Sequence, residues 1–304
     1  MKETNVKAYT AWIAICIVWG TTYLAIRVGV GHLPPFLFAG FRWVIAGSIF
    51  LIILRIRGVK LPPKTDLKHI IVVGTALIGL GNGFVVFGEQ WIPSGLTALF
   101  ITTLPFWIVG IETFITRGSK INLKIITGLI FGLAGVLLIF GSNFKYLFDP
   151  ENIWGIISMM FAVMSWSSGT VYSKYNKIKT PLLMSASIQM LAGGTLQVAA
   201  GGILGEFTKF SFDQNSLLAF IYLIIVGSFV GYASYLYAID HLPLSLVSTY
   251  AYVNPVIALF LGWLILDEKL TLEIVIAAVI IFIGVTIVKS GSVKSRVETA
   301  ETKT

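Results

Sequence analysis

Two groups of aromatic and hydroxyl side chains lie deep inside long apolar stretches of the sequence. Each group begins with a tryptophan, Trp19 about ten residues into the first stretch and Trp166 within a later one. The residues that accompany them are Thr21, Thr22 and Tyr23 in the first stretch and Ser167, Ser168 and Thr170 in the later one. Side chains of these types could line a pocket for a small zwitterionic or amphipathic solute. The alternative is helix packing, with the hydroxyls bonded back to backbone carbonyls.

A second group of polar residues precedes two prolines that interrupt apolar stretches. The residues are Thr102 and Thr103 before Pro105, and Tyr252 and Asn254 before Pro255. A proline inside a helix leaves the carbonyl four residues earlier without its hydrogen-bond donor. Such carbonyls, beside Thr and Asn side chains, could bind a substrate amine, or the kink could serve packing alone. We expect Pro105 and Pro255 to act as hinges or to shape a site rather than to bind a ligand directly.

Asn82 and Tyr232 are further candidates for the wall of a pocket, because they lie at matching positions of an internal repeat described below, and Tyr235, which follows Tyr232, is another. Arg42 is the deepest formal charge, about eight residues after Pro35. Its guanidinium could hold a substrate carboxylate through a bidentate contact. It could also pair with an acid or with helix-end carbonyls, or extend its long side chain towards water.

Residues that would carry enzymatic or metal chemistry are scattered. His32, His69 and His241 lie far apart at loops or helix ends, and Cys16 has no candidate base nearby. A metal site needs ligands at a defined spacing, and an active site needs convergent acids, bases or nucleophiles. The sequence therefore predicts no enzyme, no metal and no cofactor.

The composition points to lipid as the solvent of this chain. Hydrophobic residues make up 56% of its 304 residues, and Asp, Glu, Lys and Arg only 12%, whereas soluble domains carry about 25% charged residues. A soluble globule could not hide so much apolar surface. The formal charge of +8 is dispersed between apolar stretches, so nucleic acid is not the expected partner.

Ten stretches reach the length of about 20 residues that a helix needs to cross a bilayer. They are 9–28, 34–54, 69–88, 94–116, 122–140, 152–173, 182–205, 216–238, 243–266 and 271–289. Backbone amides in hydrocarbon must be satisfied internally, so the prediction is an all-α membrane protein. The polar remainder, residues 291–304, is expected to be a disordered cytoplasmic tail.

Lys and Arg residues are distributed unevenly between the two sides of such a bundle. With both termini in the cytoplasm, seventeen of them fall on the cytoplasmic side and three on the opposite side. Cytoplasmic loops of membrane proteins carry an excess of Lys and Arg. This pattern predicts a multi-pass protein of the cell inner (plasma) membrane with both termini in the cytoplasm.

Residues recur between the two halves of the chain at nearly constant separation. The recurring pairs are Gly81 and Gly231, Pro93 and Pro243, Pro105 and Pro255 (150 positions apart), Pro35 and Pro181 (146), and Trp19 and Trp166 (147). Because each half holds five spans, the second half enters the membrane upside down. We therefore predict two inverted five-helix repeats, 1–144 and 145–290, around a central cavity where a solute can bind while the halves rock about it.

Short segments of both halves match the signatures of a known family. They are 17–23 (IVWGTTY), 38–42 (FAGFR), 93–95 (PSG) with Pro105, 165–167 (SWS), 250–256 (YAYVNPV) and 267–271 (DEKLT). These segments resemble motifs of the EamA family in the drug/metabolite transporter superfamily, and the similarity covers about residues 8–290. The resemblance implies a ten-helix fold with a central cavity, and an exporter of amino acids or other metabolites. It does not fix the substrate.

The function predicted from the sequence is secondary transport of small metabolites by alternating access, with amino acids or related amphipathic solutes as the expected cargo. A lipid or drug translocator, either a flippase or a multidrug efflux protein, is the alternative. The expected partners are a small-molecule substrate and the lipid bilayer. The acids Glu89, Glu112, Asp240 and Glu268 lie towards helix ends. We therefore expect transport without obligatory proton coupling.

Overall fold

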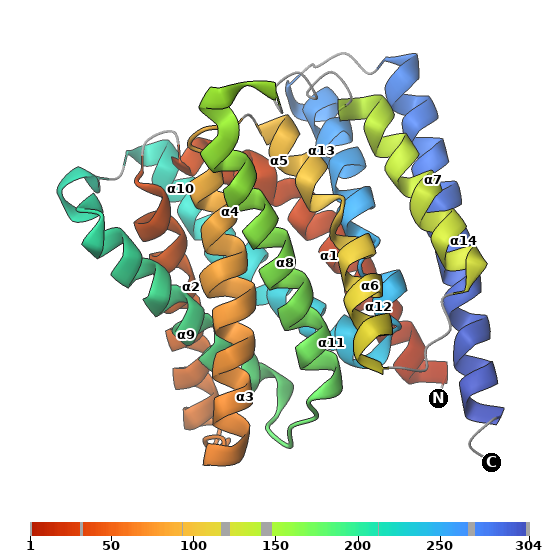
Figure 1. Cartoon of the computed structure of the whole chain (residues 1–304). Coiled ribbons are helices and arrows are strands. Elements are labelled where there is room, and N and C mark those ends of the chain that lie inside the picture. Colours follow the sequence, from red (N-terminus) through yellow and green to blue (C-terminus); the bar gives the residue numbers. More distant parts are fainter. Residues whose placement is uncertain are drawn as a thin grey trace.

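The computed structural model of the chain describes residues 2–30, 33–92, 94–116, 122–140, 148–211, 213–266 and 271–301. Every regular element in these ranges is helical, and the helices form a bundle in which α1 begins and α14 ends at the same end (Figure 1). The α-helices are α1 (Lys2–Val30), α2 (Pro35–Ile56), α3 (Lys64–Gly74), α4 (Gly83–Gly88), α5 (Ser94–Ile101), α6 (Leu104–Thr116), α7 (Leu123–Phe140), α8 (Ile153–Tyr175), α9 (Leu182–Ile203), α10 (Gln214–Tyr222), α11 (Ala233–His241), α12 (Leu244–Val247), α13 (Tyr250–Leu266) and α14 (Leu272–Glu301). Segments η1 (Thr75–Asn82) and η5 (Leu223–Tyr232) are π-helical, and η3 (Pro150–Asn152) and η4 (Glu206–Lys209) are 3₁₀ turns.

Eight helical stretches of the described residues are long and apolar enough to cross a membrane. They are Pro35–Ile56, Lys64–Gly88, Leu96–Ile115, Leu123–Phe140, Leu182–Ile203, Gln214–His241, Leu244–Leu261 and Leu272–Ser292. Helices α1 and α8, with 29 and 23 residues, are also long enough to cross a membrane, but they are not among these eight stretches. The count of ten spans therefore stays a prediction.

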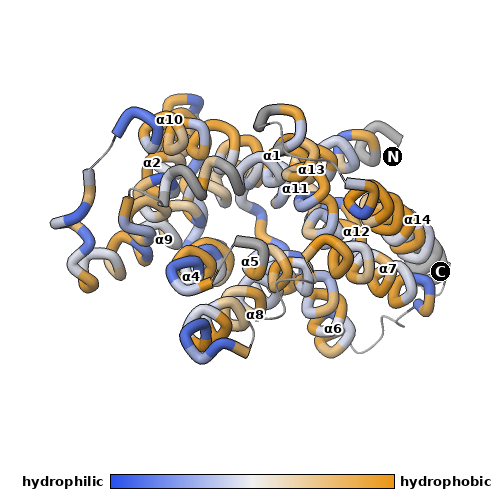
Figure 2. Tube along the Cα trace, turned by 90° about the horizontal axis from the view of Figure 1, so that it is seen from above, coloured by the Kyte–Doolittle hydropathy of each residue, from blue (hydrophilic) through white to orange (hydrophobic). Residues whose placement is uncertain are grey.

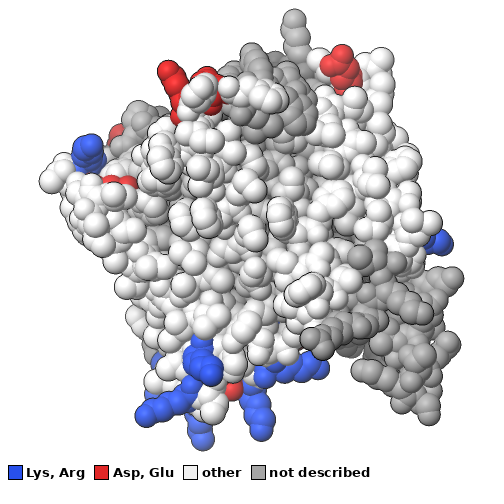
Figure 3. Space-filling view, in the orientation of Figure 1, with Lys and Arg blue, Asp and Glu red and all other residues white. Residues whose placement is uncertain are grey.

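The outer surface of the bundle is apolar. Large side chains such as Ile130, Phe161 and Val279 are more than half exposed. Figure 3 shows a broad, nearly uncharged band across the middle of one face, with Lys and Arg gathered at the lower end. An exposed apolar band of this kind is what a lipid environment stabilises.

Four of the expected spans are interrupted in their middle. The stretches expected at 69–88 and 216–238 contain the π-helical segments η1 and η5. The stretches expected at 94–116 and 243–266 are each divided into two helices, between α5 and α6 and between α12 and α13. Local changes of this kind within a helix are common where a helix lines a functional site.

The two prolines expected to act alike occupy different positions. Pro105 is the second residue of α6, where a helix tolerates proline because the first N–H groups have no partner. Pro255 lies inside α13, where it removes a hydrogen bond of the helix. The description of both as helix-interior prolines therefore holds for Pro255 alone.

Helix α14 extends into residues 291–301, and the expected disorder of the tail 291–304 stays a prediction. Helix α14 continues from Leu272 to Glu301 without interruption. The segment from 291 onwards contains no proline, and Lys, Arg, Glu and Ala residues favour a helix that is already nucleated by the preceding apolar turns.

Two antiparallel helix pairs join the first and second halves of the chain. Helix α2 packs along α9, and α7 packs along α14. In the view along the bundle, α7 and α14 lie together at one edge and α2 and α9 lie towards the other (Figure 2). Glycines allow the close approach: a Cβ atom on Gly284 would lie 2.6 Å from the Gly132 nitrogen and 2.7 Å from the Gly128 oxygen. Small residues at helix contacts are typical of membrane bundles, because backbones can then approach closely.

Two buried carboxylates hold helix starts that belong to the opposite half of the chain. Glu206 accepts hydrogen bonds from the backbone N–H groups of Phe36 (3.4 Å) and Leu37 (2.8 Å) at the start of α2. Asp66 accepts from the N–H groups of Lys179 and Thr180, both at 3.0 Å, just before α9. Neither α2 nor α9 has a side-chain cap of its own. A carboxylate at these positions satisfies free donors and favours the positive end of the helix dipole.

The contact between α7 and α14 predicts the effect of one added methyl group. Gly284→Ala should lower stability by about 1–3 kcal/mol, because the new Cβ would meet backbone atoms that cannot move aside without separating the helices. Thermal unfolding of the purified protein in detergent measures the change. Gly110→Ala is the matched control, since a Cβ atom on Gly110 would meet no atom of the other described elements within 4 Å. An equal effect of the two substitutions would contradict the importance of this contact.

Candidate functional site

A cavity of about 120 Å³ lies inside the bundle between the first and second halves of the chain. It is lined by residues of α1, α2, η1, α4, α5, α6, α8, η5 and α13. The lining residues are Trp19, Thr22, Ile26, Arg42, Trp43, Gly81, Asn82, Val85, Glu89, Ile101, Leu104, Ala162, Trp166, Gly227, Tyr250 and Asn254. This central cavity combines aromatic surfaces with few polar groups, the composition typical of small-molecule sites.

Trp19 is fixed on the cavity wall by contacts from η5. Its Nε1 donates to the carbonyl of Gly227 at 3.3 Å. A Cβ atom on Gly231 would lie 2.4 Å from the same nitrogen, so a glycine is required there. The indole packs edge-on against Trp166 with ring centroids 5.7 Å apart. The two tryptophans that the sequence pairs by repeat therefore meet in space.

Trp166 is held by a buried tyrosine behind the cavity wall. Its Nε1 donates to the Tyr235 hydroxyl at 3.0 Å, and that hydroxyl also forms a 2.5 Å hydrogen bond with Thr170. The Tyr235 ring lies 5.1 Å from Trp19 and 5.8 Å from Tyr250, measured between centroids. Tyr235 is fully buried and does not line the cavity. Its role in the structure is to position both indoles.

A polar cluster on α2, η1 and α9 forms another part of the wall. The Asn82 side-chain oxygen accepts from Trp43 Nε1 at 3.0 Å, Gln197 Nε2 at 3.4 Å and Arg42 Nη2 at 3.5 Å. The Arg42 guanidinium lies over the Trp43 ring, 4.5 Å from its centroid. Cation–π and hydrogen-bond contacts thus hold the guanidinium beside the cavity.

Glu89 also lines the central cavity. It directly follows the candidate span that ends at Gly88. Burial raises the pKa of the Glu89 carboxyl to about 7, because a low-dielectric surrounding disfavours the ionised form. The position at a helix end was expected from the sequence, but its place on the cavity wall was not. No signal in the sequence separates it from the other helix-end acids.

The structure places five of the predicted binding residues and Arg42 on the cavity wall. Those five are Trp19, Thr22, Asn82, Trp166 and Asn254. Asn254, with its amide nitrogen turned towards them, donates to the carbonyls of Tyr250 (3.0 Å) and Cys16 (2.9 Å). Besides Glu89, the wall contains two aromatic residues that were not among the predicted binding residues, Trp43 and Tyr250.

Other predicted binding residues lie outside the lining of the cavity. The Thr102 and Thr103 hydroxyls donate to the carbonyls of Leu99 (2.7 Å) and Phe100 (2.6 Å). Both hydroxyls therefore satisfy backbone carbonyls at the break between α5 and α6. The Tyr252 hydroxyl donates to the Leu129 carbonyl of α7 at 3.2 Å. Ser167, Tyr232 and Tyr235 are fully buried behind the wall. Tyr23, His32 and Glu268 lie outside the residues whose side chains the structure describes.

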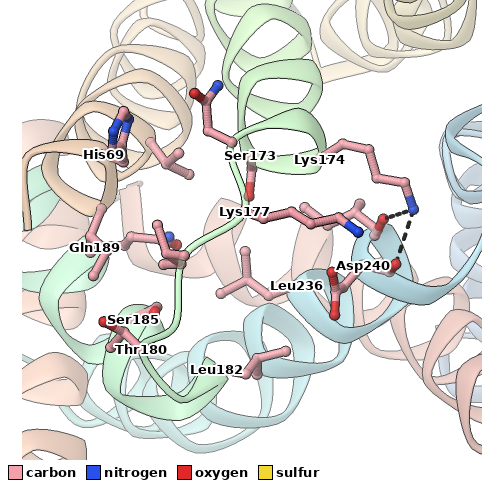
Figure 4. A pocket seen from close by; sticks show the side chains of 15 residues that line it. His69, Ser173, Lys174, Lys177, Thr180, Leu182, Ser185, Gln189, Leu236 and Asp240 are labelled. Carbon is pink, nitrogen blue, oxygen red and sulfur yellow. Dashed lines mark hydrogen bonds between the residues drawn. The ribbon is translucent and has the colours of Figure 1, made fainter. Parts of the chain in front are cut away.

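A second, larger cavity of about 370 Å³ lies among α3, α8, α9 and α11. Its lining includes His69, Lys174, Lys177, Gln189 and Asp240 (Figure 4). The Lys174 ammonium donates to the carbonyls of Ile239, Asp240 and Leu242, and so caps the end of α11.

Tyr232 links the walls of the two cavities. Its ring packs edge-on against Trp43 of the central cavity, with centroids 5.4 Å apart. Its hydroxyl donates to Gln189 of the second cavity at 2.8 Å. One buried side chain therefore contacts a wall residue of each cavity.

Comparison with known proteins decides the family. The sequence matches the EamA-like transporter family twice, over residues 6–141 and 153–290. The chain belongs to the EamA-like transporter family. This confirms the resemblance drawn from the sequence motifs, and it makes the chain a membrane transporter and not an enzyme.

Relatives of this EamA protein cover almost its full length. It is 35% identical over 278 residues to the uncharacterized inner membrane transporter YedA of Escherichia coli (strain K12), spanning 90% of this chain and 88% of that protein. It is 27% identical over 282 residues to the uncharacterized transporter YoaV of Bacillus subtilis (strain 168), spanning 92% and 96%. A solved crystal structure that is 21% identical superposes with a TM-score of 0.78 over 96% of this chain and 98% of that one, which shows a shared fold.

The raised pKa of Glu89 predicts a pH-dependent stability. The folded protein keeps this proton up to a pH of about 7, whereas the unfolded chain releases it near 4.5. The contribution of this bound proton to the free energy of unfolding is therefore complete below pH 4.5 and is lost as the pH rises through about 7. Glu89→Gln should raise the melting temperature at pH 8 by about 2–4 °C for each ~1 kcal/mol of relieved desolvation, with little change near pH 5.

Thermal unfolding across this pH range is the measurement. Glu273→Gln serves as the control, because Glu273 is exposed in the first turn of α14. Parallel pH profiles for Glu89→Gln and the unmodified protein would show that the Glu89 carboxyl is not desolvated.

Proposed function

We propose that this EamA protein is a secondary transporter that carries small amphipathic metabolites across the inner membrane by alternating access around the central cavity. Amino acids and related solutes are the proposed cargo. The observation that carries this proposal is the central cavity itself, an aromatic pocket with a few polar groups between the two halves of an apolar bundle. A solute bound there would contact side chains from both halves of the chain.

In this proposal the chain forms ten spans, in two inverted five-helix repeats at 1–144 and 145–290. The two family matches at 6–141 and 153–290 support the division. The antiparallel packing of α2 on α9 and of α7 on α14 supports the inversion, because each pair joins matching elements of the two halves. The π-helical segments η1 and η5 also lie at matching positions.

The proposed orientation has both termini in the cytoplasm. Helix α1 begins and α14 ends at the end of the bundle where Lys and Arg gather (Figures 1 and 3). An excess of Lys and Arg marks the cytoplasmic side of a membrane protein. The second cavity, with Lys174 and Lys177 on its wall, then faces the cytoplasm.

The proposed path runs from the central cavity to the second cavity past Tyr232. A conformational change that separates Tyr232 from Gln189 or Trp43 would connect the two spaces. Wall residues proposed to contact the solute are Trp19, Thr22, Asn82, Trp166 and Asn254. The remaining predicted contact residues and the two hinge prolines would act by shaping or opening this path. They are Tyr23, Thr102, Thr103, Ser167, Tyr232, Tyr235, Tyr252, Pro105 and Pro255.

Transport by purified protein in proteoliposomes tests the function. A panel of radiolabelled amino acids, nucleosides and organic cations is offered with and without a pH gradient. Uptake or efflux of at least one small solute, absent from protein-free vesicles, is the expected result. Failure of every solute in the panel, under both conditions, would contradict the proposal.

Removal of either cavity tryptophan should lower the flux strongly while the protein stays folded. Trp19→Ala and Trp166→Ala each delete an aromatic wall, and we expect at least about a tenfold loss, the effect of ~1.4 kcal/mol of lost binding. Trp154→Ala is the matched control, since Trp154 lies on α8 as Trp166 does but is 63% exposed. Unimpaired flux in both cavity variants would show that the solute passes elsewhere.

A further inference from the structure

Arg42 brings a positive charge into the interior of the bundle. The residue lies in the second turn of α2 and its side chain is only 5% exposed. Guanidinium groups stay protonated in proteins. Because Arg42 lines the central cavity, its charge faces the proposed solute site and not the lipid.

The described contacts of this guanidinium do not neutralise it. Nη2 donates to the Asn82 oxygen at 3.5 Å, a long and therefore weak hydrogen bond. The planar group lies over the Trp43 ring. Its Nε has no hydrogen-bond partner among the described residues. An amide oxygen and an indole face carry no negative charge, so the usual carboxylate partner of a buried arginine is missing from this set.

Glu89 is the acid on the same cavity wall. Within the described part of the chain, neither a hydrogen bond nor an ion pair joins it to Arg42. Burial raises the pKa of the Glu89 carboxyl to about 7. The cavity therefore holds one permanent cation and one acid that is readily protonated.

A buried, uncompensated charge in a membrane protein is costly, and such residues are typically functional. Arg42 has free donor capacity in a fixed fork, the geometry that matches a carboxylate in a bidentate contact. The indoles of Trp19, Trp43 and Trp166 supply apolar surface beside it. Together these features fit an anionic head group attached to an apolar body.

We infer that Arg42 selects the solute: the transported compound carries a carboxylate, which binds the guanidinium, on an aromatic or aliphatic body that packs against the tryptophans. This inference rests on the proposed transport function and adds the charge of the cargo. A carboxylate is required in this scheme, and an ammonium group on the solute is not.

A set of four phenyl compounds separates these features. 3-Phenylpropionate carries the carboxylate alone, L-phenylalanine carries carboxylate and ammonium, 2-phenylethylamine carries the ammonium alone, and 3-phenylpropanol carries neither. Binding to the purified full chain in detergent is measured by calorimetry and by the change in tryptophan fluorescence. We expect both carboxylates to bind at least about tenfold more tightly than the amine and the alcohol, the ratio expected for one charge-assisted hydrogen-bonded contact.

Substitutions then assign the selectivity to one residue. Arg42→Gln should remove the preference for the two carboxylates, and Arg42→Lys should retain part of it, because lysine keeps the charge but not the fork. Arg55→Gln is the matched control, since Arg55 lies in the last turn of the same helix and is exposed. Full carboxylate selectivity in Arg42→Gln would overturn the inference.

The unmodified protein provides a test that does not depend on the folding of a variant. Equal or tighter binding of the amine or the alcohol, or no binding of either carboxylate at millimolar concentration, would overturn the inference. If neutral or cationic solutes are nevertheless carried in proteoliposomes, the transport function stands and only the role of Arg42 fails. If carboxylates bind selectively but no solute crosses the membrane, the proposed function fails and the anion site remains.

Discussion

Polar groups in the middle of this bundle cannot find hydrogen-bond partners at its outer surface, because that surface is apolar. Each polar group must find its partner within the protein or face an internal cavity. The structure meets this constraint in several ways: hydroxyls bond back to carbonyls at helix breaks, carboxylates cap helix starts, and a tyrosine satisfies an indole. The cavity wall contains polar groups such as Arg42 and Glu89. Placing these groups against lipid would cost far more free energy than placing them at the cavity.

The constraint also explains how the cavity is held in shape. Trp19 comes from α1 and Trp166 from α8, and both are oriented by elements of the second half, through Gly227 and Tyr235. A side chain with its own hydrogen bond and ring contacts has few rotamers left. The wall is therefore largely preorganised, which reduces the entropy lost when a solute binds.

Much of the architecture could be predicted from composition and spacing. Apolar length identified a helical membrane protein, and the motifs around Trp19 and Tyr250 identified the family. The pairing of Trp19 with Trp166 also followed from their equivalent positions in the repeat. These predictions succeed because the length of a span and the position of a residue along it depend on the local sequence alone.

Side-chain direction could not be predicted in the same way. Tyr252 and Asn254 are two residues apart on α13, so they point to different faces of the helix and only one of them can line the cavity. Asn254 lines it and Tyr252 faces α7, and the sequence does not show which face of α13 meets the cavity. In the spans that contain η1 and η5, the π-helical segment also changes the register of the side chains that follow it. Glu89 was missed for a related reason, since a helix-end acid can face water or a cavity, and only the packing of neighbouring helices decides which.

The exchange of carboxylates between the halves has a consequence for biosynthesis. Glu206 reaches back 169 residues along the chain to the Leu37 N–H group. During translation, α2 is therefore made and inserted long before the residue that completes its first turn exists. Until then water or lipid head groups must satisfy those amides, and the amino-terminal half reaches its final form only when the ribosome has passed residue 206.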